Sequence, residues 1–187
     1  MKMNNRRVDL FLEDIEYNIR EALDFTSEGK DMFFSSTKTQ YAVEKAIENI
    51  GEAVKNLDDE TKKIVPYEDW SAISRTRDYF VHHYFGIDTN LVWDIVQKDI
   101  PMLQIIINKI REVKRQEKIQ AAKNPNTSQD DLIFLSKDTD AVIRKAVAEN
   151  PSSSWDVLKE LQWDSDKAIK EIANKRIMEL PRRRMKM

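Results

Sequence analysis

Apolar residues recur every three or four positions along most of the first 120 residues, a spacing typical of amphipathic helices. The first such stripe, in residues 8–25, contains Phe11, Ile15, Ile19 and Leu23. Further stripes predict helices over about 38–57, from about residue 70, and over 91–120. Gly51 interrupts the second stripe at a cost of about 1 kcal/mol relative to alanine, which indicates close packing there. Only three glycines in 187 residues argue against an all-β fold with many tight turns, so we expect an all-α protein.

Between these helices the sequence predicts connections and one kink. The polar stretch 26–37 contains a glycine and is predicted to be a loop. Asp88 or Thr89 is the candidate cap of the last long helix. Because Pro101 lies inside that helix, we expect Asp99 to cap a helix that restarts after a kink.

Composition narrows the possible functions. The chain contains no cysteine, which excludes disulfides, thiolate catalysis and cysteinyl metal sites, and its two histidines argue against structural zinc. Lys and Arg number 31 against 33 Asp and Glu, so any site for a polyanion must be local. No apolar run approaches the ~20 residues of a membrane span, and the charged start is not typical of a signal peptide. We expect a cytoplasmic protein that needs no metal and no cofactor.

An internal repeat begins beyond residue 120. Asn124-Pro125 recurs as Asn150-Pro151, a spacing of 26 residues. The same spacing relates Leu132 to Leu158, Leu135 to Leu161, Asp138 to Asp164, Asp140 to Asp166, and Ile143 to Ile169. Each unit is predicted to contain a turn, a short helix, an acidic turn and a second helix. The candidate helix caps are Thr127-Ser128 and Ser153-Ser154 after the prolines, and Asp140 and Asp166 after the acidic turns.

These patterns predict two domains, residues 1–115 and residues 116–187. The second domain contains the two 26-residue units and resembles leucine-rich repeat variant or, more loosely, HEAT-type helical repeats. It ends in a basic tail that contains Arg182, Arg183 and Arg184. We interpret these arginines as a candidate RNA contact or, alternatively, as a solvated tail.

One segment, 74–88, gathers the residues that could carry chemistry. It holds both histidines of the chain, together with Arg77, Asp78 and Tyr84. A histidine can transfer a proton between the 2′-hydroxyl of RNA and the leaving oxygen, and an arginine can stabilise charge on the phosphorus. On a straight helix Arg77 and His82 diverge by about 140°, whereas Arg77 and Tyr84 lie within about 20° of one face. Arg77 and His82 therefore meet only if the helix ends or bends between them, or if the site spans two protomers.

The same residues have structural interpretations. Arg77 can pair with a carboxylate while His82 caps a helix end, and His83 can be a surface or interface residue. The aromatic residues of the region can stack RNA bases, but at this spacing they are more typical of a core or a dimer interface. They are Trp70, Tyr79, Phe80, Phe85 and Trp93.

The spacing Arg77-x4-His82-x-Tyr84 matches the R-x4-H-x-Y motif of HepT-like toxins, within the HEPN superfamily of ribonucleases. The resemblance covers about residues 5–115. It also includes Ile50-Gly51-Glu52-Ala53-Val54, the bend from Pro66 to Trp70, His83-Tyr84-Phe85-Gly86-Ile87-Asp88, Val92-Trp93 and Asp99-Ile100-Pro101-Met102-Leu103. The extension beyond residue 115 is not part of the basic family pattern.

The resemblance implies an antiparallel helical bundle that forms a two-fold homodimer, with Arg77 and His82 of both chains approaching one another in the cleft between them. It implies metal-independent RNA cleavage, restrained by a nucleotidyltransferase antitoxin of the MntA type that transfers AMP to Tyr84. Asp78 would orient Arg77 or the histidine, unless it is only a solvated surface residue.

Two other functions remain open. The bundle can be a non-catalytic module that binds a nucleotide or RNA or docks the nucleotidyltransferase. Alternatively, the repeats are the working surface and the bundle is a device for dimerisation.

Overall fold

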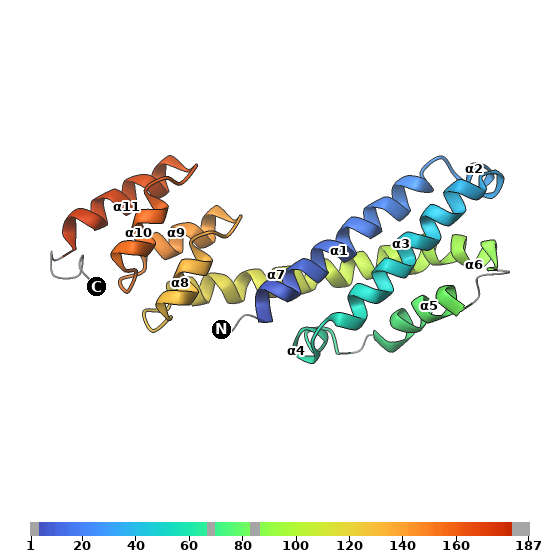
Figure 1. Cartoon of the computed structure of the whole chain (residues 1–187), viewed down its shortest axis with the longest axis horizontal. Helices are drawn as coiled ribbons and strands as arrows, with labels where there is room; N and C mark the ends of the chain where they lie inside the picture. Colours follow the sequence, from blue (N-terminus) through green and yellow to red (C-terminus); the bar gives the residue numbers. More distant parts are fainter. Residues whose placement is uncertain (1–3, 67–69, 83–86, 181–187) are drawn as a thin grey trace. The chain divides into compact units, whose positions relative to one another are not determined.

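The computed structural model describes the backbone of residues 4–66, 70–82 and 87–180, and their side chains except at residues 4–7, 74, 76, 77 and 80–82. All regular structure in this part of the chain is helical, which confirms the expected all-α fold (Figure 1). The chain divides into an N-terminal unit, Met3–Glu112, and a C-terminal unit from Val113 onward. The assignment of residues 1–115 and 116–187 as two domains with separate roles stays a prediction.

The N-terminal unit contains six helices, one π-helical turn, and the start of a seventh helix within the described residues. In chain order these are α1 (Asn4–Phe25), α2 (Lys30–Ser35), α3 (Thr37–Asn56), α4 (Asp59–Lys62), α5 (Trp70–His82), α6 (Thr89–Asp94), η1 (Ile95–Asp99) and α7 (Ile100–Lys123). Helix α3 packs against α1 along one side and α5 along the other (Figure 1).

The core of this unit consists of apolar residues at helical spacing. On α1 the buried residues are Val8, Leu12, Ile15, Ile19 and Ala22. The buried face of α1 is therefore rotated slightly from the predicted apolar stripe. Leu23, which the sequence placed in that stripe, is 37% exposed. At the edge of this core, Arg111 of α7 donates from Nε and Nη2 to the two carboxylate oxygens of Glu16, at 2.9 and 3.1 Å. This bidentate pair ties α7 to α1.

The predicted loop over 26–37 is wrong in part, because residues 30–35 form helix α2. Phe33 is only 1% exposed, and its ring centroid lies 5.4 Å from that of Phe34 and 5.3 Å from that of Trp93. This short helix is stabilised by aromatic packing against a residue some sixty positions away in the chain. A six-residue segment carries too little periodicity to reveal that packing.

The predicted kink at Pro101 takes a different form. Asp99 caps no new helix, because residues 95–99 form a π-helical turn between α6 and α7 and the helical backbone continues through it. The N–H of Ile100 donates to the carbonyl of Ile95 across this turn. Pro101 has no N–H to give and its ring crowds the carbonyl four residues earlier, so one wider turn accommodates it. The other predicted cap is confirmed, since the Asp88 side chain accepts from the N–H of Asn90 at 2.9 Å.

The C-terminal unit holds the end of α7 and four shorter helices. These are α8 (Gln129–Leu135), α9 (Ala141–Glu149), α10 (Trp155–Leu161) and α11 (Lys167–Glu179). All four begin at predicted caps, namely Ser128, Asp140, Ser154 and Asp166. Their apolar faces enclose a core that includes Leu132, Leu135, Ile143, Leu161 and Ile169.

Several polar contacts in this unit recur at the 26-residue spacing. Lys118 pairs with Asp138 at 3.1 Å, and 26 residues later Arg144 pairs with Asp164 at 2.7 Å. In the same way, the hydroxyl of Thr127 donates to a carbonyl six residues before it, as does that of Ser153. Assignment of these helices to a named repeat family stays a prediction.

Asn150 offers a test of what holds the C-terminal unit together. It is 2% exposed, and its Nδ2 donates to the carbonyls of Ala122 and Asn124 at 2.7 and 2.9 Å. Its Oδ1 accepts from the N–H of Ser152 at 2.8 Å. Because Asn150→Ala strands these groups, we expect it to lower the free energy of unfolding by about 2–4 kcal/mol, measured by urea denaturation.

The matched control is Asn124→Ala, 26 residues earlier. Asn124 is exposed, and its Oδ1 accepts a hydrogen bond from the N–H of Asn126 at 2.9 Å. We expect a loss of less than about 1 kcal/mol for this variant. Equal losses in the two variants would contradict the role given to Asn150.

Candidate functional site

Helix α5 carries the residues that the sequence singles out. It begins at Trp70, whose indole Nε1 donates to the carbonyl of Lys62 at 3.1 Å, so the start of α5 lies beside the end of α4. Lys62 in turn donates from Nζ to the carbonyl of Lys55 near the end of α3. The first turn of α5 therefore lies near the last turns of α3, and the two helices run antiparallel (Figure 1).

The predicted site residues fall partly within the described structure. Arg77 and His82 lie on the backbone of α5, and His82 is its last residue, but both side chains lie outside the described part. Asp78 is exposed. His83, Tyr84 and the basic tail with Arg182, Arg183 and Arg184 lie outside the described residues.

The helical register of α5 separates the two motif positions. Helix α5 runs unbroken from Trp70 to His82, so it does not end between them. Position 77 lies about 40° around the axis from Ile73, which packs against the core. Position 82 lies about 180° from Ile73 and within about 20° of the exposed Arg75. The helical register of the backbone therefore puts position 77 on the flank toward the bundle and position 82 on the outward face.

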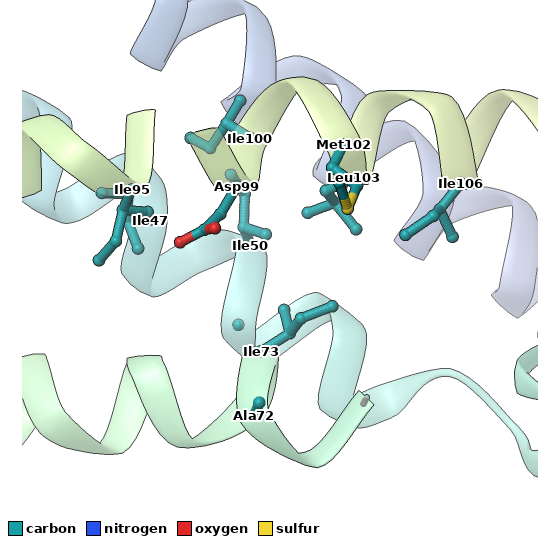
Figure 2. A pocket seen from close by; sticks show the side chains of 11 residues that line it. Ile47, Ile50, Ala72, Ile73, Ile95, Asp99, Ile100, Met102, Leu103 and Ile106 are labelled. Carbon is teal, nitrogen blue, oxygen red and sulfur yellow. The ribbon is translucent and has the colours of Figure 1, made fainter. Parts of the chain in front are cut away.

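A pocket of about 290 Å³ opens beside the first two turns of α5 (Figure 2). Residues from α3, α5, η1 and α7 line it, and they are mainly aliphatic. They are Ile47, Ile50, Gly51, Ala72, Ile73, Ile95, Asp99, Ile100, Met102, Leu103 and Ile106. Asp99 is the one charged residue among them, and its carboxylate comes from the π-helical turn.

Gly51 and Ala72 place small residues on the facing sides of α3 and α5. Gly51 is buried, as the close packing inferred from the sequence requires. The pocket itself was not predicted, because the sequence does not show which residues of α7 come to face α5. Apart from the Asp99 carboxylate its lining is apolar, so it is mainly a place for apolar groups.

Three of the candidate base-stacking aromatic residues have structural roles. Trp70, Tyr79 and Trp93 all pack against the core of the N-terminal unit. Trp93 additionally contacts the rings of Phe33 and Phe34. The side chain of Phe80 and the whole of Phe85 lie outside the described part. The interpretation of these aromatic residues as core therefore holds where the structure describes them.

One titratable group on α3 is perturbed by burial. Partial burial raises the pKa of Glu44 above its ordinary value. Sequence reasoning missed this residue, because a glutamate on an amphipathic helix is normally solvated. The only available signal is its position, two helical turns before Gly51 on the same face.

Among the described residues, no three histidine, aspartate or glutamate side chains are grouped as a metal ion would require. None of the described helices combines the length and the apolar character needed to cross a membrane.

Comparison with known proteins gives a consistent picture for the N-terminal unit. The family model described as "Ribonuclease HepT-like" matches residues 15–110. A Methanocaldococcus jannaschii protein with a provisional RNase name is 40% identical over 113 residues, covering 60% of this chain and 88% of that protein. The "Probable ribonuclease HepT" of Thermococcus cleftensis is 40% identical over 103 residues, covering 54% of this chain and 94% of its own. No solved structure matches the chain.

Proposed function

The chain belongs to the HepT-like ribonuclease family, and from this premise we propose that it is a metal-independent endoribonuclease toxin whose site forms between two copies of the chain. The observation that carries the proposal is the intact Arg77-x4-His82 spacing on one unbroken helix, within the matched residues. The proposed partners are an RNA substrate, a second copy of the chain, and an antitoxin of the MntA type.

The proposed reaction needs a proton acceptor, a proton donor and a cation at one phosphodiester. The 2′-oxygen attacks phosphorus while an imidazole of His82 takes its proton. The bond from phosphorus to the 5′-oxygen breaks, and an imidazole gives that oxygen a proton. Arg77 stabilises the additional negative charge on the five-coordinate phosphorus. The products are a 2′,3′-cyclic phosphate and a 5′-hydroxyl.

The register of α5 supports a site that spans two protomers. Positions 77 and 82 diverge by about 140° on a helix that continues between them, so one copy does not readily bring both to a single phosphate. A two-fold axis beside α5 brings position 82, on the outward face of α5 in one copy, toward the flank of α5 that carries position 77 in the other copy. Asp78, exposed on α5, is proposed to orient Arg77 or the imidazole.

Tyr84 is proposed as the regulatory residue. Its phenol oxygen attacks the α-phosphorus of ATP on the nucleotidyltransferase, pyrophosphate leaves, and an adenylyl group remains on the tyrosine. The added phosphate brings negative charge two residues from His82 in the sequence, where it repels the substrate phosphate. The basic residues Arg182, Arg183 and Arg184 are proposed as an auxiliary RNA contact.

The test is incubation of the purified chain, free of its antitoxin, with RNA in EDTA. We expect cleavage to continue in EDTA and to leave 2′,3′-cyclic phosphate and 5′-hydroxyl ends, identified by end-labelling and mass spectrometry. Treatment with the nucleotidyltransferase and ATP should stop cleavage for the wild type and leave Tyr84→Phe active. Binding of RNA without cleavage would instead favour the non-catalytic module.

A further inference from the structure

The pocket lined by α3, α5, η1 and α7 has an apolar buried side and a charged mouth. Ile50, Leu103 and Ile106 form the buried side, and each of them is at most 6% exposed. At the mouth Met102 is 61% exposed, and Asp99 is exposed as well. Figure 2 shows the Asp99 carboxylate directed from the π-helical turn toward the space that the other lining residues surround. The pocket therefore combines apolar walls with one negative charge at a place that water reaches.

The carboxylate of Asp99 has no cationic partner of its own. Among the described residues, none donates a hydrogen bond to it or forms an ion pair with it. Its neighbour Lys98 donates instead to Asp94, at 2.8 Å. Between Lys98 and Asp99 there is only a weaker attraction at longer range. The acceptor positions of Asp99 are therefore available to a cation from outside the chain.

The size and the lining of the pocket define the ligand that it can hold. Its volume is about 290 Å³. A closed apolar cavity of about 150 Å³ holds benzene, so this pocket has room for a chain of about six to ten carbon atoms. An ammonium at the end of such a chain meets Asp99 at the mouth and stays partly hydrated, so that neither charge is buried without a partner. A carboxylate or phosphate at the same place is repelled by Asp99.

We propose that this pocket is a binding site for small aliphatic amines. The apolar tail of the amine packs against the buried side, and its ammonium donates hydrogen bonds to the Asp99 carboxylate. Gly51 and Ala72 contribute little side-chain volume to the lining, which leaves the space for the tail. The turn that supplies the carboxylate is π-helical, a local geometry that is frequent at functional sites. The site does not depend on RNA cleavage and goes beyond the proposed function.

The test uses hexylamine as the probe and compares it with hexan-1-ol and hexanoate, which carry tails of similar length. Binding to the full chain is followed by NMR of the isoleucine δ1 methyl groups. We expect shifts at Ile73 and Ile106, which line the pocket, and none at Ile143 and Ile169 in the core of the C-terminal unit. At low salt hexylamine should bind about three- to fivefold more tightly than hexan-1-ol, as expected for one exposed ion pair, and hexanoate more weakly than either.

Three variants assign the binding to its parts. Asp99→Asn, a change at an exposed side chain, should bring the affinities of hexylamine and hexan-1-ol within about twofold of each other. The control is Glu48→Gln, which removes the same charge next to the lining residue Ile47 but from a side chain paired with Lys45 at 3.0 Å, so the preference for the amine should remain. Ala72→Leu places a larger side chain in the pocket and should weaken both ligands by at least about tenfold, with circular dichroism showing that the helices are retained.

Three outcomes would overturn the inference. The first is equal affinity of the wild type for hexylamine and hexan-1-ol, and the second is an undiminished preference for the amine in Asp99→Asn. The third is a shift of the pocket methyl groups when the protein alone is diluted, because a second copy of the chain would then fill the pocket. None of these measurements involves RNA, so their results are independent of the ribonuclease assays.

Discussion

Replacement of His82 by alanine is expected to lower the rate of RNA cleavage by about 10²- to 10⁴-fold, because its imidazole is the proposed proton-transfer group. Arg77→Ala is expected to lower it by about 10²- to 10³-fold through lost stabilisation of the phosphorus charge. Single-turnover cleavage of a labelled RNA in EDTA measures both. Arg75→Ala, an exposed arginine on the same helix, should change the rate by less than about tenfold.

Mixing the two inactive variants tests the site between protomers. If Arg77 of one chain works with His82 of the other, a mixed dimer of Arg77→Ala and His82→Ala chains retains one intact site. Random exchange should then restore about a quarter of the wild-type sites. No recovery, in variants whose circular dichroism is unchanged, would contradict a site that spans two chains. Wild-type rates in both single variants would identify a contaminating nuclease.

Loss of Asp164 is expected to cause a large loss of stability in the C-terminal unit. Its side chain is 3% exposed and accepts from Nε and Nη2 of Arg144 at 2.7 and 3.0 Å, while Arg144 is 12% exposed. Asp164→Ala removes the carboxylate and leaves the Arg144 guanidinium buried without its charged partner. We expect this to lower the free energy of unfolding by about 3–5 kcal/mol. Urea denaturation measures the loss, and hydrogen exchange should locate it in α9, α10 and α11.

The control is Glu149→Ala, which removes only a surface pair. Lys145 and Glu149 lie 3.9 Å apart with more than half of each side chain exposed, so we expect a loss of less than about 1 kcal/mol. A loss for Asp164→Ala no larger than for Glu149→Ala would contradict the role of the buried pair.

The same pair sets a pH dependence. Hydrogen bonding from Arg144 lowers the pKa of Asp164 below its ordinary value of 3.8. A lowered pKa in the folded state means that the stabilisation is complete above pH 3.8 and is lost as the pH falls further through the folded-state pKa. We expect the difference in stability between wild type and Asp164→Ala to shrink over this acidic range.

Much of the fold follows from short-range signals in the sequence. The apolar spacing identified the long helices α1 and α3, and the serine and aspartate caps identified the starts of α8 to α11. These features depend on residues within four or five positions of one another, so the sequence displays them directly. Local spacing also placed Arg77 and His82 on one helix and showed that they diverge.

Other features depended on contacts between distant segments. Helix α2 exists because Phe33 packs beside Trp93, and the pocket exists because α7 passes alongside α3 and α5.

The sequence alone determined the helical class, the helix boundaries near their caps, and the motif with the chemistry that it implies. Only the tertiary structure decided which faces of the helices meet, and therefore which charged groups lose water. Helix formation is governed by neighbours along the chain, whereas burial depends on the sum of contacts from segments far apart in the sequence. For this reason the motif was predictable and the pocket beside α5 was not.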